Sequence, residues 1–207
     1  MSSEELFALI ALATLGTFTP GPNTALSATI AANHGLRRAL PFVCAVPAGW
    51  GILLILNAAG LGVMVLGFPP LRWGLLGTSV LYLLWLAYKL VGTQRLDEAP
   101  LSTIVGFKDG VMLQFINIKA WFLALSVVSG WVIGHDDSPE RLLVALPIFL
   151  FFGLTSNLMY AWIGAILRHW LRGPNDTALR LQWFNRCMAL VLLGTVVWMV
   201  RSALQLA

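Results

Sequence analysis

The sequence predicts an all-α, polytopic membrane protein with six transmembrane helices arranged as two inverted three-helix repeats. Of its 207 residues, 58% are hydrophobic and 11% charged, whereas an ordinary soluble domain has about 25% charged residues. Apolar runs long enough to cross a bilayer, which takes about 20 residues, alternate with polar or Pro- and Gly-containing connections. Six such runs use almost the whole chain, so we expect one transmembrane domain over 1–207 and no separate soluble domain.

Each predicted span is an apolar run that ends at polar residues, proline or glycine. The spans are Leu6–Ala31, Pro41–Leu66, Leu71–Leu90, Gly110–Ile133, Leu142–Leu167 and Arg186–Leu206. Between the second and third, the segment 67–70 (Gly-Phe-Pro-Pro) predicts a tight turn. Val91–Asp109 and Arg168–Asn185 are the long polar connections, and two spans separate them. Both are therefore expected on the same face of the membrane.

The distribution of basic residues predicts the orientation, because short cytoplasmic loops are enriched in Lys and Arg. One face would carry Arg37, Arg38, Lys89, Arg95, Lys108, Arg168, Arg172, Arg180 and Arg186, and the other Arg72, Arg141 and Arg201. The first face is predicted to be cytoplasmic, in a bacterial inner membrane. Both termini are then outside, together with Glu4, Glu5, Asp136, Asp137 and Glu140. The segment Met1–Glu5 has no basic residue, so we expect no cleavable signal peptide.

Six spans divide into two sets of three, and an odd number in each set requires any repeat to be inverted. Pro47 and Asn57 in the second span recur one hundred residues later as Pro147 and Asn157 in the fifth. A chain with ten prolines can also produce such a match by coincidence. On the repeat interpretation, the first unit covers about 1–92, a cytoplasmic linker about 93–108, and the second unit about 109–207.

The segment Thr19-Pro20-Gly21-Pro22-Asn23 lies about halfway along the first span. Its two prolines remove backbone donors, and their rings clash with carbonyls one turn earlier, so we expect the helix to break here. Inside a bilayer the freed backbone groups need partners, and the ends of half-helices can hold a carboxylate or an ammonium group. The alternative is a packing kink that binds no ligand.

The fourth span contains Gln114, Asn117 and Lys119, followed by Trp121. At the helical rise Lys119 lies about 14 Å inside the span, too deep to reach the interface comfortably. An ionisable residue at that depth usually faces the bundle interior and pairs with a polar group or lines a pathway. We expect its partners to be carbonyls freed by the first break, the amides of Asn117 and Asn23, or a substrate carboxylate. The alternative is a structural lysine that ties two helices together.

Several other residues could contribute to a site or only to packing. Asn57 and Asn157 are deep amides, whose commoner role is hydrogen bonding between helices. Trp121 and Trp50 are also deep and either wall a substrate path or pack in the core. Cys44 and Cys187 have no second cysteine or metal-ligand spacing nearby, so we expect free, packed thiols.

The same inventory argues against other classes of protein. The three histidines, His34, His135 and His169, fall at predicted loops without ligand partners, so we expect no metal and no cofactor. The predicted spans place no His, Asp or Glu deep in the membrane, which argues against an enzyme. Scattered basic residues indicate no nucleic-acid partner. A membrane thiol or electron carrier would need cysteines at the helix breaks, and Cys44 and Cys187 lie elsewhere. A non-transporting assembly subunit is the remaining alternative.

The first motif, Thr19-Pro20-Gly21-Pro22-Asn23, together with Asn117-Ile118-Lys119-Ala120, resembles the LysE/RhtB family of amino-acid exporters. The resemblance covers the whole chain. It implies a proton-motive-force-dependent inner-membrane exporter of amino acids such as lysine, arginine, threonine, homoserine or leucine, or of related small metabolites. The family usually has proline between the Asn and Lys of the second motif, so Ile118 predicts a weaker second break.

The resulting hypothesis is a secondary exporter of small zwitterions that works by alternating access, with the two broken helices facing each other. Its candidate substrate residues are Thr19, Pro20, Gly21, Pro22, Asn23, Gln114, Asn117, Lys119, Trp121, Asn57 and Asn157. Lys119 would pair with the substrate carboxylate. The candidate partners are an amino acid or analogue, the lipid bilayer and a second copy of the chain. For proton coupling the nearest carboxylate is Asp109, at the cytoplasmic start of the fourth span.

Overall fold

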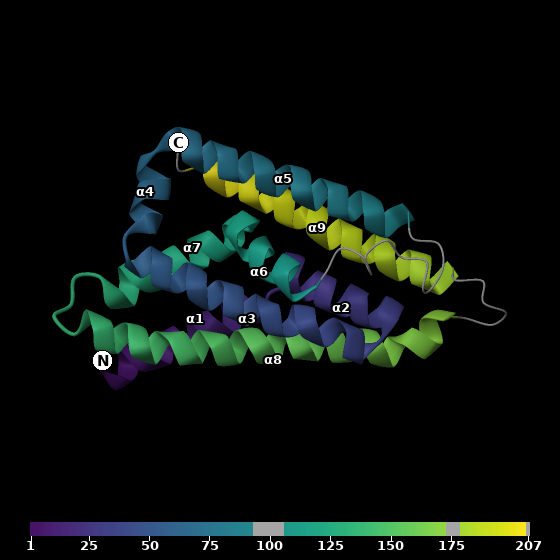
Figure 1. Ribbon diagram of the computed structural model, residues 1–207, viewed down its shortest axis with the longest axis horizontal. Coiled ribbons are helices and arrows are strands. Elements are labelled where there is room, and N and C mark those ends of the chain that lie inside the picture. The colour runs from purple at the N-terminus through teal and green to yellow at the C-terminus, as the bar shows by residue number, and fades with distance from the viewer. Residues whose placement is uncertain (93–105, 173–178, 206–207) are drawn as a thin grey trace.

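The computed structural model describes residues 1–92, 106–172 and 179–205, and all regular structure in these ranges is helical, as predicted (Figure 1). In chain order the elements are α1 (Ser3–Phe18), α2 (Pro22–His34), α3 (Leu36–Ala58), α4 (Leu61–Gly67), α5 (Pro69–Gly92), α6 (Phe107–Ile116), α7 (Ile118–Val127), the π-helix η2 (Val128–Val132), α8 (Ser138–Arg172) and α9 (Leu179–Gln205).

Within the described ranges, four helices are long and apolar enough to cross a membrane: α3, α5, α8 and α9. The count rises to five if α6 and the segment α7–η2, bent by 70° at their junction, form one span. The first predicted span, Leu6–Ala31, is divided between α1 and α2 and is not among these candidates. The full plan of six spans in two inverted repeats therefore stays a prediction.

The predicted second span, Pro41–Leu66, is wrong at both ends. Helix α3 begins earlier, at Leu36, and ends at Ala58, whereas α4 is a separate short helix that turns away from α3 (Figure 1). The chain turns at Gly60, whose φ of 98° lies in the left-handed region that favours glycine. An apolar run concealed this boundary, because hydropathy alone does not report backbone direction.

The polar connections also differ from the predicted ones. Helix α8 continues to Arg172 and α9 begins at Leu179, so the connection predicted over Arg168–Asn185 is largely helical. Most of the predicted linker, about 93–108, lies outside the described residues, but α6 already begins at Phe107.

Helix α2 lies at the centre of the bundle and is buried over nearly its whole length, packed chiefly against α8 and also against α3. Glycines permit the closest approaches. A Cβ atom added to Gly164 of α8 would collide with the carbonyl of Ala28, and one added to Gly49 of α3 would lie 2.9 Å from the backbone of Val111 in α6. Helices α5 and α9 form a separate pair along one side (Figure 1).

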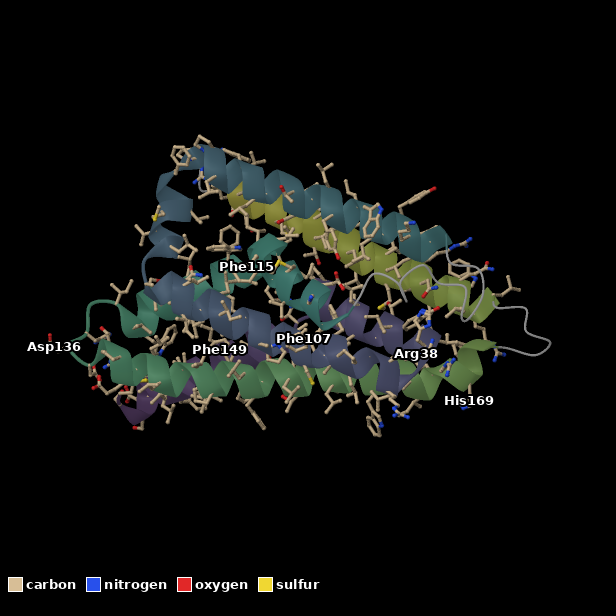
Figure 2. All side chains as sticks on the ribbon, viewed as in Figure 1. Arg38, Phe107, Phe115, Asp136, Phe149 and His169 are labelled. Atoms are coloured by element: carbon tan, nitrogen blue, oxygen red, sulfur yellow. The ribbon has the colours of Figure 1, made fainter. Side chains whose placement is uncertain are left out.

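The two ends of the bundle differ in charge. The start of α1 and the end of α9 lie at the same end as Asp136, and Arg38 and His169 lie at the opposite end (Figure 2). At the acidic end, Arg141 of α8 contacts Glu5 of α1 (3.1 Å) and Asp137 (2.6 Å). This arrangement agrees with two termini on one side; which side faces the cytoplasm stays a prediction.

Candidate functional site

The first helix breaks where its prolines predict. Helix α1 ends at Phe18, Thr19 and Gly21 are extended, and Pro22 occupies the first turn of α2. Proline suits that position because a first-turn N–H has no helical partner. Thr24 stabilises the new helix start: its hydroxyl accepts a bond from the Gly21 N–H (2.9 Å) and donates to the Gly21 carbonyl (3.1 Å).

The break frees the last carbonyls of α1, and other helices supply their donors. A helix end leaves such carbonyls without intrahelical partners, which is costly in an apolar environment. Three consecutive carbonyls are satisfied by side chains from α8 and α7: Ser156 Oγ donates to Thr17 (2.8 Å), Tyr160 Oη to Phe18 (3.0 Å) and Lys119 Nζ to Thr19 (3.1 Å). Of the three kinds of partner expected for Lys119, the structure shows a carbonyl at the first break.

The second break lies between α6 and α7, directly before Ile118. The two segments meet at 70° although no proline is present. Asn117 produces the break: its backbone is extended (φ −78°, ψ 98°), and its side-chain oxygen accepts a bond from the Lys119 N–H (3.2 Å), capping α7. Asparagine is among the strongest N-cap residues, so a capping side chain replaces the steric effect of proline.

Freed carbonyls at the second break also receive side-chain donors. The indole N–H of Trp121 donates to the Phe115 carbonyl at 2.9 Å, and the Ser79 hydroxyl of α5 donates to the Ile116 carbonyl. Trp121 is buried and does not line the cavity described below. Of the two roles considered for Trp121, the structure therefore places it in packing, as a backbone partner.

A reciprocal pair of amides joins the two broken helices. Asn23 Nδ2 donates to Gln114 Oε1 (2.8 Å), and Gln114 Nε2 donates to Asn23 Oδ1 (3.1 Å). Gln114 also donates to the Gly110 carbonyl of its own helix (2.9 Å). The pair holds the start of α2 against the end of α6, beside both breaks.

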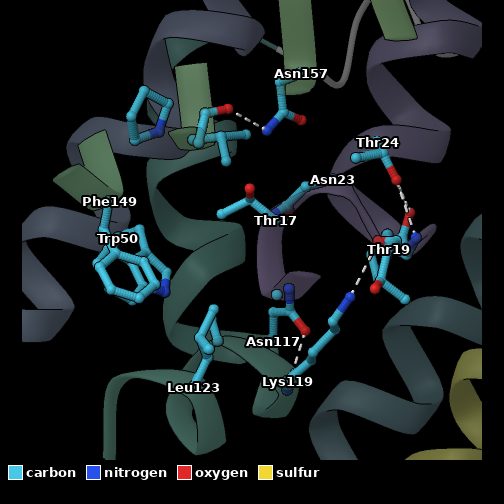
Figure 3. Close-up of a pocket in the computed structure, with 17 residues that line it drawn as sticks. Thr17, Thr19, Asn23, Thr24, Trp50, Asn117, Lys119, Leu123, Phe149 and Asn157 are labelled. Atoms are coloured by element: carbon cyan, nitrogen blue, oxygen red, sulfur yellow. Dashed lines mark hydrogen bonds between the residues drawn. The ribbon is translucent and has the colours of Figure 1, made fainter. Parts of the chain in front are cut away.

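A cavity of about 60 Å³ lies at the first break, between α1, α2, α3, α7 and α8 (Figure 3). It has room for a few water molecules. Seven predicted residues line it: Thr19, Gly21, Pro22, Asn23, Asn117, Lys119 and Asn157. Lys119 and Thr19 face Trp50 and Phe149 across the view in Figure 3. Pro20 instead lines a second cleft. Gln114 does not line the cavity but bonds to Asn23, which does.

The two asparagines matched in the proposed repeat have different surroundings. Asn157 lines the cavity, accepts a bond from Ser27 Oγ (2.9 Å) and donates to the Gly153 carbonyl (2.8 Å). Asn57 is buried near the end of α3, donates to the Leu53 carbonyl (2.7 Å) and does not line the cavity. The structure thus brings Asn157, but not Asn57, to the candidate site.

Sequence reasoning considered Trp50 as a wall of a substrate path but did not identify its partner Phe149. The rings of Trp50 and Phe149 are stacked, with centroids 4.6 Å apart, and both line the cavity. A usable signal was present in α8, where Phe149, Gly153 and Asn157 recur at helical spacing and therefore share one face. Such a row of aromatic, small and polar residues differs from a purely apolar packing face.

The chemistry of the cavity is that of a polar, cationic pocket. Of the described residues that line it, Lys119 alone is ionisable; the others supply amides, hydroxyls, backbone groups and apolar side chains. These groups do not form a metal-ligand set.

The predicted proton carrier, Asp109, is exposed, and its carboxylate accepts a bond from the Gly106 N–H (2.8 Å) at the start of α6. Cys44 and Cys187 are free as predicted but exposed rather than packed.

The chain is similar in sequence to known transport proteins. The family model of the LysE type translocator matches residues 14–202. A cysteine/O-acetylserine efflux protein of Klebsiella pneumoniae is 26% identical over 171 residues, 81% of this chain and 86% of the relative. The protein of the same name from Salmonella choleraesuis is 26% identical over 155 residues, which are 74% of this chain and 79% of the relative. The one from Escherichia coli O1:K1 is 23% identical over 155 residues, with the same coverage of both chains. No solved structure matches significantly. The chain belongs to the LysE type translocator family.

Proposed function

We propose that this protein is an inner-membrane secondary transporter that exports small amino acids with uncharged side chains. The family assignment supports amino-acid export, and the similar proteins are named for efflux of cysteine and O-acetylserine. Both compounds are zwitterions, and their side chains are small and uncharged at neutral pH. The proposal gives this chain the same class of substrate.

The observation that carries the proposal is the position of the Lys119 ammonium group. It lies at the first break, bonded at 3.1 Å to a neutral carbonyl, in a cavity without a lining carboxylate. A half-buried cation inside an apolar bundle is costly unless it is paired, and the residues that line this cavity offer Lys119 only a dipole. In our proposal a substrate carboxylate provides the missing negative charge and binds Lys119 Nζ.

The rest of the cavity suits the other parts of a small amino acid. The substrate ammonium group would approach the side-chain oxygens of Asn23 and Asn157 and the carbonyls near the break. The stacked rings of Trp50 and Phe149 offer an apolar wall for the side chain. A lysine or arginine side chain would bring a second cation without an acidic partner among the lining residues, so we propose that such substrates are excluded.

The broken helices support alternating access as the mechanism. In repeat-built transporters, discontinuous helices from the two halves meet at a central site, and one half moves against the other. Here α1–α2 and α6–α7 are both discontinuous and are joined by the Asn23–Gln114 pair beside the cavity. In our proposal the six predicted spans move as two groups about this junction.

Counterflow in liposomes tests the proposed function. Purified protein is reconstituted with unlabelled O-acetyl-L-serine or L-cysteine inside, and uptake of the same labelled compound is measured against protein-free liposomes. We expect both compounds to exchange and L-lysine to exchange poorly in the same assay. Absence of exchange for both neutral compounds would contradict the transport proposal; equal exchange of L-lysine would contradict the proposed selectivity.

A further inference from the structure

A second cleft adjoins the cavity on the opposite side of Lys119. It measures about 470 Å³ and lies between α1, α7 and α9. Gly16, Thr19 and Lys119 line both spaces, so the cavity and the cleft meet at these residues. The remaining wall is mostly apolar and includes Leu12, Leu15, Gly194 and Trp198.

The cleft points toward one end of the molecule. Leu12 and Leu15 precede the first break on α1, and Gly194 and Trp198 belong to the second half of α9. The start of α1 and the end of α9 lie at the same end of the bundle (Figure 1). The cleft therefore runs from the first break toward the end that is predicted to face outside.

The cleft also lies where the bundle is least tightly joined. Helix α9 packs mainly against α5, and more weakly against α2 and α8, whereas α1 packs chiefly against α8. The cleft separates these two packing groups. A small movement of the α5–α9 pair would widen or narrow it without breaking the α1–α8 contacts.

We propose that this cleft is the outward arm of the transport path and a second, transient binding position for the substrate. The proposal rests on the proposed export function. The carboxylate stays on Lys119 Nζ, which is common to both spaces, while the rest of the amino acid passes Gly16 and Thr19 from the cavity into the cleft. Retaining the ion pair avoids exposing either charge to the apolar wall.

Glycine positions allow a matched test. A Cβ atom at Gly194 meets no atom within 4 Å, so Gly194→Leu has room for its Cβ and places an apolar side chain in the cleft. Gly77 of α5 is also in open space and lines neither cavity, which makes Gly77→Leu the control. Equilibrium binding of labelled O-acetyl-L-serine to purified protein reports the inner cavity, and counterflow of the same compound reports the complete path.

We expect Gly194→Leu to bind O-acetyl-L-serine within about twofold of wild type but to lose counterflow by about tenfold or more, since even one added methylene alters a fitted site by that factor. Gly77→Leu should keep both. Counterflow within about twofold of wild type in Gly194→Leu would overturn the second position and leave the proposed function intact. Equal loss of binding and counterflow at an unchanged unfolding temperature would also overturn it.

Two further measurements keep the outcome decisive. Should Gly194→Leu unfold at a lower temperature than wild type, Gly194→Val is judged by the same criteria. Wild-type protein that neither binds nor exchanges O-acetyl-L-serine or L-cysteine would contradict the proposed function itself, and the second position with it.

Discussion

The two helix breaks reach a similar backbone geometry by different routes. At the first, Pro22 begins α2 after an extended Gly21; at the second, Ile118 begins α7 after an extended Asn117. Proline imposes the first break sterically, whereas the Asn117 side chain caps the second. A break in an apolar bundle therefore depends less on proline than on whether the freed backbone groups find partners.

The origin of those partners distinguishes the two breaks. At the second, the donors are Trp121 of the same broken helix and Ser79 of α5, and both are buried in packing. At the first, all three donors come from other helices, and one of them, Lys119, is a cation that lines a cavity. We infer that the second break mainly positions Lys119 and that the first receives the substrate.

The largest effect should come from removing the neutral donors of the first break. Ser156→Ala with Tyr160→Phe leaves two carbonyls unpaired, at about 1 to 3 kcal/mol each, or about 2 to 6 kcal/mol in total. Ser79→Ala, the control at the second break, leaves one. Thermal unfolding and O-acetyl-L-serine counterflow would be measured for both. We expect counterflow to be lost only at the first break; equal loss at both would remove the distinction between them.

A smaller effect is expected at the amide pair between the breaks. In a double-mutant cycle of Asn23→Ala and Gln114→Ala, two reciprocal hydrogen bonds should give a coupling energy of about 1 kcal/mol in unfolding stability. Asn33→Ala combined with Gln114→Ala is the control. Asn33 is buried in α2, the helix that also contains Asn23, but its side chain donates to the Thr29 carbonyl instead of to Gln114. Additive effects for Asn23 and Gln114 would show that the pair does not join the helices energetically.

A still smaller effect is expected from Ile118→Pro. Residue 118 is the first of α7, where proline costs no helical bond, and the preceding Asn117 already has the extended backbone that proline requires. We expect counterflow to be retained and stability to change by about 1 kcal/mol or less. Ala120→Pro is the control: it removes the Ala120 N–H bond to the Asn117 carbonyl (2.8 Å) and should impair folding. Severe loss in Ile118→Pro would show that the two breaks are not interchangeable.

The smallest effect concerns the ion pairs that anchor the start of α1, in which Arg141 of α8 contacts Glu5 and Asp137. The described part of α6 has no such anchor. Hydrogen bonding to Arg141 holds the pKa of Asp137 below its ordinary value. The contribution of Asp137 to stability is therefore complete above the unfolded-state pKa, about 4, and is lost as pH falls through the lower folded-state value. Asp137→Asn should reduce the acid-side decrease in unfolding temperature, to which Glu5 also contributes, and the neighbouring Asp136→Asn should not. An identical acid profile for Asp137→Asn and wild type would contradict the anchor.

Sequence reasoning located the first break because two prolines and a glycine restrict the backbone locally, whatever the tertiary contacts. It also placed Lys119 inside the bundle, where its side chain is half-buried, and included a freed carbonyl among three expected kinds of partner, since an apolar environment leaves a cation few choices. Pairing Asn23 with Gln114 required the relative register of two helices, which no local pattern encodes.

Other errors have similarly specific causes. The boundary between α3 and α4 depends on one glycine inside an apolar run, and glycine in such a run is equally compatible with close helix packing. The 70° bend at the second break depends on the Asn117 cap, a signal that is less conspicuous in a sequence than proline because asparagine also occurs in packed helices. Phe149 and Gly153 share a helix face with Asn157 but were not predicted, because aromatic and small residues in an apolar helix are equally compatible with ordinary helix packing.

Binding of labelled O-acetyl-L-serine to purified Lys119→Ala, compared with wild type and with Lys108→Ala, tests the central claim most directly. Lys108 is an exposed lysine of α6 that lines neither cavity, so its substitution matches the change in charge. Loss of one partner from a buried charge pair costs about 2 kcal/mol or more, which is about 30-fold in affinity. We predict at least that loss for Lys119→Ala and unchanged binding for Lys108→Ala. Affinity of Lys119→Ala within about twofold of wild type would contradict a substrate pocket built on this ammonium group.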